Sequence, residues 1–284
     1  MVRSKEEIKE AVRKHYGDAI SKTSGSCCAP KPVELETGTV ARYVELAGYT
    51  EEELAGVPET ATTFGCGNPV NFIDVKPGQT LLDLGSGAGL DLILASRKVG
   101  PRGKVIGLDM TPQMIDACKK NLTKAGVTNF DVRLGEMEQM PVADAEVDWI
   151  ISNCVINLSP DKETVFSEAF RVLKPGGRML VSDIVTNNLP EKYRNDLSAW
   201  VGCIAGAVEE DEYIGLVRKA GFIDVNVVDR LVYTEQTLDA LANDYCGCGP
   251  DGNRKEVPKS LDKFGVKDCS GRVSSIKLSA RKPA

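Results

Sequence analysis

The sequence predicts an α/β fold, a doubly wound and mostly parallel sheet of Rossmann-like type, with an N-terminal lid and a smaller C-terminal α+β region. Three observations lead to this prediction. Short apolar segments alternate with amphipathic helical segments from residue 79 to about residue 185. A loop with three glycines follows the first apolar segment, and an acidic residue ends the second. Strands and helices that alternate in this way form a parallel sheet with helices on both faces.

The elements of this region follow one another in a regular order. Thr111 suits a helix N-cap and Pro112 suits the first helical position, so a helix is expected to begin there. The KPGG stretch at 174–177 is expected to end a later helix. The remaining helices are expected at 90–99 and 162–173, and the strands at 80–85, 103–109, 130–135, 147–153 and 178–185.

The flanking regions are predicted to be less regular. Ile8, Val12, Tyr16 and Ala19 recur at helical spacing, which predicts an amphipathic helix that covers the core and leads into a Gly/Ser/Pro-rich loop at 24–32. Beyond the core we expect helices at 187–207 and 209–222, a loop at 246–260, and strands at 224–233 and 274–282 that join the main sheet or form a small one. The predicted regions are 1–78 (lid and cysteine-bearing loops), 79–186 (core) and 187–284 (helices and α+β region).

Composition and charge narrow the class of partner. The 284 residues contain 35 Lys and Arg against 41 Asp and Glu, a net charge of −6. This balance argues against electrostatic binding of nucleic acid or anionic lipid. The N-terminus does not resemble a secretory signal, and no stretch reaches the roughly 18–20 apolar residues of a membrane span. We therefore expect a cytoplasmic protein whose nine cysteines are reduced and are better candidates for ligands or nucleophiles than for structural disulfides.

The glycine loop predicts a nucleoside site. Gly85, Gly87 and Gly89 are spaced G-x-G-x-G, whereas a dinucleotide fingerprint reads G-x-G-x-x-G, which weakens an NAD interpretation. Glycines allow close approach of a ligand to the backbone, and the helix that follows offers free N–H groups. Asp109 ends the second predicted strand, where a carboxylate accepts hydrogen bonds from ribose hydroxyls.

The glycine loop, the acid after the second strand and the GEMEQMPV segment after the third resemble the class I S-adenosylmethionine-dependent methyltransferases over residues 79–185. The resemblance implies that the glycine loop passes the methionine part of the cofactor and that Asp83 holds its amino group. It further implies that Met110, Glu136 and Met137 flank the adenine and that Asn153 lines the pocket floor.

Three cysteines lie near these motifs. Cys66 lies between two glycines, Cys154 directly follows the fourth predicted strand, and Cys203 lies among glycine and alanine neighbours. Each alone is equally well explained as a small buried apolar side chain. Together, the segments FGCGNP, SNCVINL and GCIAGA resemble the arsenite methyltransferases.

This second resemblance implies a methyl transfer from S-adenosylmethionine to trivalent arsenic, giving methylated arsenicals in detoxification. Cys66, Cys154 and Cys203 are the implied arsenic ligands, for arsenite or its thiol conjugates. Cys28, or else its neighbour Cys27, matches a further cysteine of the family. By the same resemblance, Cys28 and Cys66 form a transient disulfide that thioredoxin or glutathione reopens.

The chemistry of arsenic suits these residue types. Trivalent arsenic is soft and prefers thiolates, and its lone pair is the nucleophile toward the sulfonium methyl group. No resident metal is expected, since the single histidine, His15, is remote from the motifs. Cys246 and Cys248 either capture arsenic or form an incidental loop pair, and Cys118 and Cys269 are expected to have no catalytic part. Two alternatives remain: a methyltransferase for a small organic acceptor, and a thiol-based metalloid-binding protein without catalysis.

Overall fold

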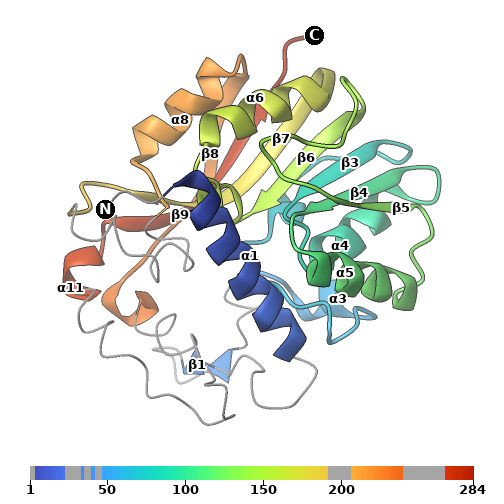
Figure 1. Cartoon of the computed structure of the whole chain (residues 1–284), viewed down its shortest axis with the longest axis horizontal. Coiled ribbons are helices and arrows are strands. Elements are labelled where there is room, and N and C mark those ends of the chain that lie inside the picture. The colour runs from blue at the N-terminus through green and yellow to red at the C-terminus, as the bar shows by residue number, and fades with distance from the viewer. Residues whose placement is uncertain (1–3, 23–32, 35–39, 42–46, 191–205, 239–265) are drawn as a thin grey trace.

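Figure 1 shows a computed structural model of the chain, which describes residues 4–22, 33–34, 40–41, 47–190, 206–238 and 266–284. Its centre is a seven-stranded sheet with strand order β5-β4-β3-β6-β7-β9-β8. The neighbouring pairs from β5 to β7 are parallel, and β9 is antiparallel to both β7 and β8. This arrangement confirms the predicted α/β class. The strands are β3 (Thr80–Leu84), β4 (Lys104–Asp109), β5 (Phe130–Leu134), β6 (Val147–Asn153), β7 (Leu173–Thr186), β8 (Ile223–Val232) and β9 (Val273–Arg281).

Helices cover both faces of the sheet (Figure 1). Successive side chains of a strand point to opposite faces, and Leu81 and Leu82 of β3 accordingly belong to two different apolar cores. The core that contains Leu81 packs against α4 (Leu90–Val99) and α5 (Pro112–Lys124). The core that contains Leu82 packs against α6 (Lys162–Val172) and α8 (Glu210–Lys219). The fold is therefore doubly wound, as predicted.

The N-terminal helix α1 (Lys5–Lys22) is amphipathic, as its residue spacing predicts, and it packs against α5. Figure 1 shows it crossing below the lower ends of the central strands. Val12 of α1 is buried in a third apolar cluster that also contains Cys154. The short elements are the antiparallel pair β1 (Val33–Glu34) and β2 (Val40–Ala41), α3 (Glu51–Leu54), η1 (Pro69–Phe72), η2 (Ile156–Leu158) and α11 (Val266–Cys269).

The structure differs from the predicted elements around α5 and α6. Helix α6 ends at Val172, but the KPGG stretch belongs to β7, which pairs with β6 from Leu173 onward through an irregular register. Thr111 occupies the N-cap of α5, yet its hydroxyl makes no capping bond. Its N–H instead donates to Asp109 at 2.8 Å, because that carboxylate already lies at the end of β4.

The C-terminal predictions of a helix at 209–222 and of strands at 224–233 and 274–282 are confirmed. Helix α8 and strands β8 and β9 lie within a few residues of their predicted bounds, and both strands join the main sheet. Residues 187–190 of the predicted helix at 187–207 are not helical. Residues 191–205 and the predicted loop at 246–260 lie outside the described residues.

Candidate active site

A pocket opens where β3, β4 and β6 end, and α1 forms one of its walls. Asp83, Gly85 and Asp109 line it from the first two strands, and Val12 and Tyr16 line it from α1. This is the edge at which open parallel sheets bind ligands. The other predicted cofactor residues that line the pocket are Gly87, Met110, Met137 and Asn153, and Cys154 joins them.

The glycine loop has a backbone that few other residues adopt. Gly85, Gly87 and Gly89 have φ angles of 67°, 50° and 90°, in the left-handed region that glycine tolerates. A Cβ on Gly85 would overlap the side chain of Val155, so this position also lacks the space for one. A Cβ on Gly87 would meet its nearest atom only at 4.0 Å. The loop therefore presents bare backbone to the pocket, as close approach of a nucleoside requires.

Asp109 fixes the shape of that loop. Its carboxylate accepts hydrogen bonds from the N–H groups of Gly87, at 3.1 Å, and Thr111, at 2.8 Å. Burial raises its pKa, and the hydrogen bonds from Thr111 and Gly87 act in the opposite direction. Asp109 therefore fixes the conformation of the glycine loop, and it also lies at the position where the ribose of a nucleoside is expected.

The pocket gathers buried carboxylates. Burial, followed by the negative charges of Asp91 and Asp109, raises the pKa of Asp83 well above its ordinary value. Burial likewise raises the pKa of Asp91 to about 6, although Tyr49 and Asn153 donate to it. Carboxylates confined in this way favour a cationic ligand, because a positive charge restores their ionised form. An ammonium or sulfonium group fits this environment.

Glu136 has a different place from the one predicted. It is not among the residues that line the pocket, and it forms ion pairs with Lys9, at 2.7 Å, and Arg13, at 3.2 Å, both from α1. Its neighbour Glu138 lines the pocket instead and lies 3.6 Å from Lys9. Three ion pairs between α1 and the segment after β5 therefore hold the helix against the site. Gly89 also lies outside the lining, at the N-cap of α4.

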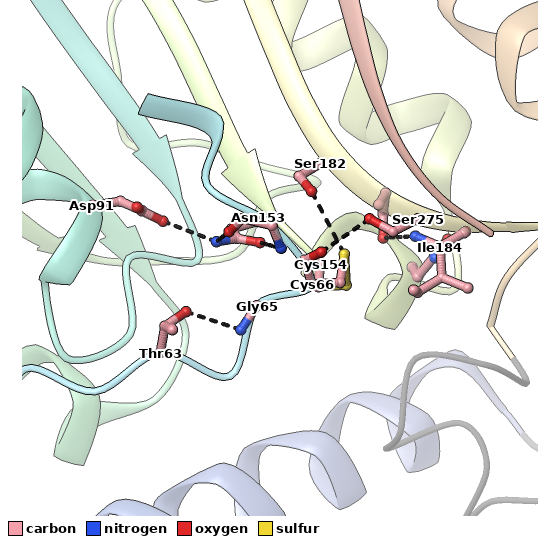
Figure 2. Close-up of a disulfide and its surroundings, with 12 residues drawn as sticks. Thr63, Gly65, Cys66, Asp91, Asn153, Cys154, Ser182, Ile184 and Ser275 are labelled. Carbon is pink, nitrogen blue, oxygen red and sulfur yellow. Dashed lines mark hydrogen bonds between the residues drawn. A yellow bond between two sulfur atoms is a disulfide. The ribbon is translucent and has the colours of Figure 1, made fainter. Parts of the chain in front are cut away.

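The structure brings two of the three predicted arsenic ligands together. Cys66 and Cys154, 88 residues apart in sequence, are joined by a disulfide, with their Cα atoms 5.7 Å apart (Figure 2). Cys154 has a φ of 63°, a left-handed conformation that costs a non-glycine residue roughly 1–2 kcal/mol. Its N–H donates to the carbonyl of Ser182 at 2.7 Å. The predicted partner of Cys66 was Cys28, whereas the described structure pairs it with Cys154.

The remaining cysteines fall into two groups. Cys203, Cys28, Cys27, Cys246 and Cys248 lie outside the described residues. Cys118 and Cys269 are buried, and burial raises the pKa of the Cys118 thiol to about 12. Within the described part of the chain, no three His, Cys, Asp or Glu side chains are arranged to hold a metal ion.

Asn153 connects the cofactor pocket to the cysteines. Its amide donates to the carbonyl of Gly67 at 2.6 Å and to Asp91 at 3.1 Å, and its oxygen accepts from the Gly67 N–H at 3.2 Å. Tyr49 donates to Asp91 at 2.7 Å and accepts from Asn153 at 3.0 Å. Figure 2 shows the link to Asp91 on one side of Asn153 and the cysteines on the other.

Sequence reasoning identified Asn153 but missed Tyr49, Asp91, Lys9 and Ser182. Asp91 carried a usable signal, since it follows the last glycine of the loop by two positions and lies in the first turn of a helix. Tyr49 is separated from Asp91 by 42 residues, and no local pattern indicates their contact.

The seven-stranded sheet with its antiparallel β9, the glycine loop and the acid at the end of β4 together define a class I methyltransferase. A family model described as a methyltransferase domain matches residues 75–221. The arsenite methyltransferase of Halobacterium salinarum is 41% identical over 246 residues, 84% of this chain and 63% of that protein. The human arsenite methyltransferase is 31% identical, over 82% of this chain and 63% of its own length. The chain thus spans less than two thirds of these relatives.

A solved structure supports the same relationship. An arsenic(III) S-adenosylmethionine methyltransferase from Chlamydomonas reinhardtii is 30% identical with a TM-score of 0.62, and the match covers 84% of this chain and 73% of that one. The chain belongs to the arsenite methyltransferase family.

Among the helices that the structure describes, none combines the length and apolar character that crossing a bilayer requires.

Proposed function

We propose that the protein transfers the methyl group of S-adenosylmethionine to trivalent arsenic held by Cys66, Cys154 and Cys203. The observation that carries this proposal is the contact of Cys66 with Cys154, which lines the cofactor pocket. Two sulfurs close enough to bond to each other are close enough to share one arsenic atom. The relatives named arsenite methyltransferase support the choice of acceptor.

The residues of the pocket fit S-adenosylmethionine. The open backbone at Gly87 would give the nucleoside room, Asp109 would accept a hydrogen bond from its ribose, and Asp83 would hold its ammonium group. When bound, the cofactor supplies a methyl group on a positively charged sulfur. The buried carboxylates favour that charge, and α1 excludes water from this side of the pocket.

Arsenic capture needs the reduced cysteines. A thiol reductant such as glutathione, itself oxidised to a disulfide, supplies the two electrons and two protons that open the bond between Cys66 and Cys154 to thiols. Three thiols then replace the three hydroxyls of arsenite with release of three water molecules. The arsenic lone pair takes the methyl group, which raises the formal oxidation state of arsenic to five. The Cys28 thiolate then attacks the Cys66 sulfur, and the electron pair of the arsenic–sulfur bond returns to arsenic.

The last step leaves methylated trivalent arsenic on Cys154 and Cys203 and a disulfide between Cys28 and Cys66. Thioredoxin or glutathione is the reductant that we propose for this disulfide. We place the reaction in the cytoplasm, where thiols are kept reduced. The proposed product serves detoxification of arsenic.

The test is incubation of the full chain with arsenite, S-adenosylmethionine and a thiol reductant, followed by arsenic speciation. We expect methylated arsenic from the parent protein and from Cys269→Ala, whose side chain is buried outside the pocket. Cys66→Ser and Cys154→Ser should lose at least 100-fold in rate, roughly the effect of removing a ligand or a catalytic group, while cofactor binding by calorimetry persists.

Other outcomes would identify the alternatives. Cofactor binding with unchanged inorganic arsenic would refute the proposal and favour a methyltransferase for an organic acceptor. Arsenite binding without cofactor binding would refute it in favour of a metalloid-binding protein.

A further inference from the structure

Asn121 of α5 joins two segments of the chain that are far apart in sequence. Its side chain is buried, and its amide donates to the carbonyl of Ala88 at 2.9 Å. The oxygen of the same amide accepts a hydrogen bond from the hydroxyl of Thr60 at 2.5 Å. Ala88 lies inside the glycine loop, and Thr60 begins the segment that leads to Cys66. One side chain therefore contacts both the cofactor loop and the segment that carries a proposed arsenic ligand.

The glycine loop lies directly on the face of α5 that carries Asn121. A Cβ on Gly89 would come within 2.9 Å of the Sγ of Cys118, which lies one turn before Asn121 on the same side of the helix. Ala88 is buried as well, so its carbonyl needs a donor from the protein. The amide of Asn121 supplies that donor and fixes the loop to α5.

The second segment runs from Thr60 to Cys66, and its residues 62–65 line the pocket. The sheet holds the Cys66 end. The Ser275 hydroxyl of β9 donates to the carbonyl of Cys66 at 3.0 Å, and the Ser182 hydroxyl of β7 lies 3.7 Å from the Cys66 Sγ (Figure 2). The hydrogen bond from Thr60 to α5 holds the other end. The pocket wall made by this segment is thus fastened on both sides.

We propose that Asn121 is a positioning residue that holds the segment from Thr60 to Cys66 at a fixed place relative to the glycine loop. This inference rests on the proposed function, because Cys66 is one of the proposed arsenic ligands. Methyl transfer by direct displacement depends on the distance and alignment of donor and acceptor. A donor loop and an acceptor segment that move independently therefore lose rate without losing affinity for the cofactor.

Hydrogen exchange of the reduced full chain tests this link without arsenic. S-adenosylmethionine should slow exchange of the amides at 61–66 about fivefold. The reason is that, once the cofactor immobilises the glycine loop, the segment opens only if a hydrogen bond of about 1 kcal/mol breaks. Thr60→Val keeps the shape of an exposed side chain and removes its hydroxyl, so it should fold and lose this slowing. Thr60→Ser should restore the slowing, and Asn121→Ala should lose it.

Asn129 provides the matched control. Its amide also donates to backbone carbonyls, those of Gly100 at 2.9 Å and Gly103 at 2.7 Å, in the turn before β4 at the sheet edge opposite the pocket. Asn129→Ala should keep the slowing by the cofactor. If the slowing persists in both Thr60→Val and Asn121→Ala, the proposal is overturned, because the cofactor then restrains residues 62–65 by direct contact.

Single-turnover methylation measures the consequence for the reaction. Reduced protein loaded with arsenite is mixed with saturating S-adenosylmethionine, and methylated arsenic is followed over time. Thr60→Val should slow the transfer about 10-fold, since a misplacement of about 1 Å can cost about 100-fold. Its dissociation constant for the cofactor, measured by calorimetry, should match that of the parent.

The two measurements separate this inference from the proposed function. A merely structural role of the Thr60–Asn121 contact would lower stability and leave the transfer rate of the folded protein unchanged. Equal transfer rates for Thr60→Val and the parent would therefore overturn the positioning role. If the parent itself forms no methylated arsenic, the proposed function fails, and the hydrogen-exchange result still decides whether Asn121 links the two segments.

Discussion

Replacing Asn153 by Ala tests whether one amide links the cofactor pocket to the cysteines. The side chain makes contacts at 2.6 Å and 3.2 Å with the backbone of Gly67, and at 3.0 Å and 3.1 Å with Tyr49 and Asp91. An amide has two N–H donors, so at most two of its three donor contacts form fully. Three hydrogen bonds of about 1 kcal/mol each then give a destabilisation of about 3 kcal/mol.

The assay is urea unfolding of the full chain under reducing conditions. Asn226→Ala is the control, because Asn226 is an exposed residue of β8 whose amide also donates to a backbone carbonyl, at 3.0 Å. We expect it to cost no more than about 0.5 kcal/mol. Asn153→Ala should also form less of the disulfide between Cys66 and Cys154 in a glutathione buffer, since the loop that carries Cys66 loses its attachment to β6.

The result that would refute this reasoning is specific. If Asn153→Ala unfolds within about 0.5 kcal/mol of the control variant and forms the disulfide to the same extent, the amide does not hold the loop. The position of Cys66 would then depend on β7 and β9 alone.

Three further predictions follow from backbone geometry, burial and charge. Gly85→Ala should abolish binding of S-adenosylmethionine, measured by calorimetry. Gly78→Ala is the control and should keep binding, because Gly78 also has a positive φ, of 91°, but a Cβ there would have no atom within 4 Å. Equal binding by the two variants would contradict the role of the loop. Burial raises the pKa of Asp183 to about 7 although Tyr213 donates to it. The folded protein therefore holds a proton that the unfolded chain releases near pH 4, and stability should fall as pH rises between about 4 and 7. Asp183→Asn should flatten that fall in thermal unfolding scans, and an unchanged slope would count against it. Because the pKa of Cys118 is raised to about 12, iodoacetamide at neutral pH should leave this thiol unmodified in the folded protein, and rapid labelling would show that it is not buried.

Local sequence patterns predicted the elements of residues 79–186 well, because each of these elements can be recognised from its own residues. The glycine loop, Asp109 at the end of β4, and the apolar strands are each recognisable within a few residues. The end of α6 was also predictable, but the assignment of 174–177 to β7 was not, because pairing with β6 is a long-range contact. Likewise, Thr111 has the right residue type for a cap, and its competing contact with Asp109 depends on where β4 ends.

The amino-acid sequence by itself determined the class of fold, the nucleoside loop and the cysteines worth attention, since residue type and spacing express backbone freedom, burial and affinity for soft ions. Only the tertiary structure decided which side chains meet. The contacts of Cys66 with Cys154 and Ser182, and of Tyr49 with Asp91, join segments separated by 42 to 116 residues. Such contacts depend on the order in which strands pair in the sheet and on which loops cross its edge. The packing of the whole chain determines the strand order and the position of these loops.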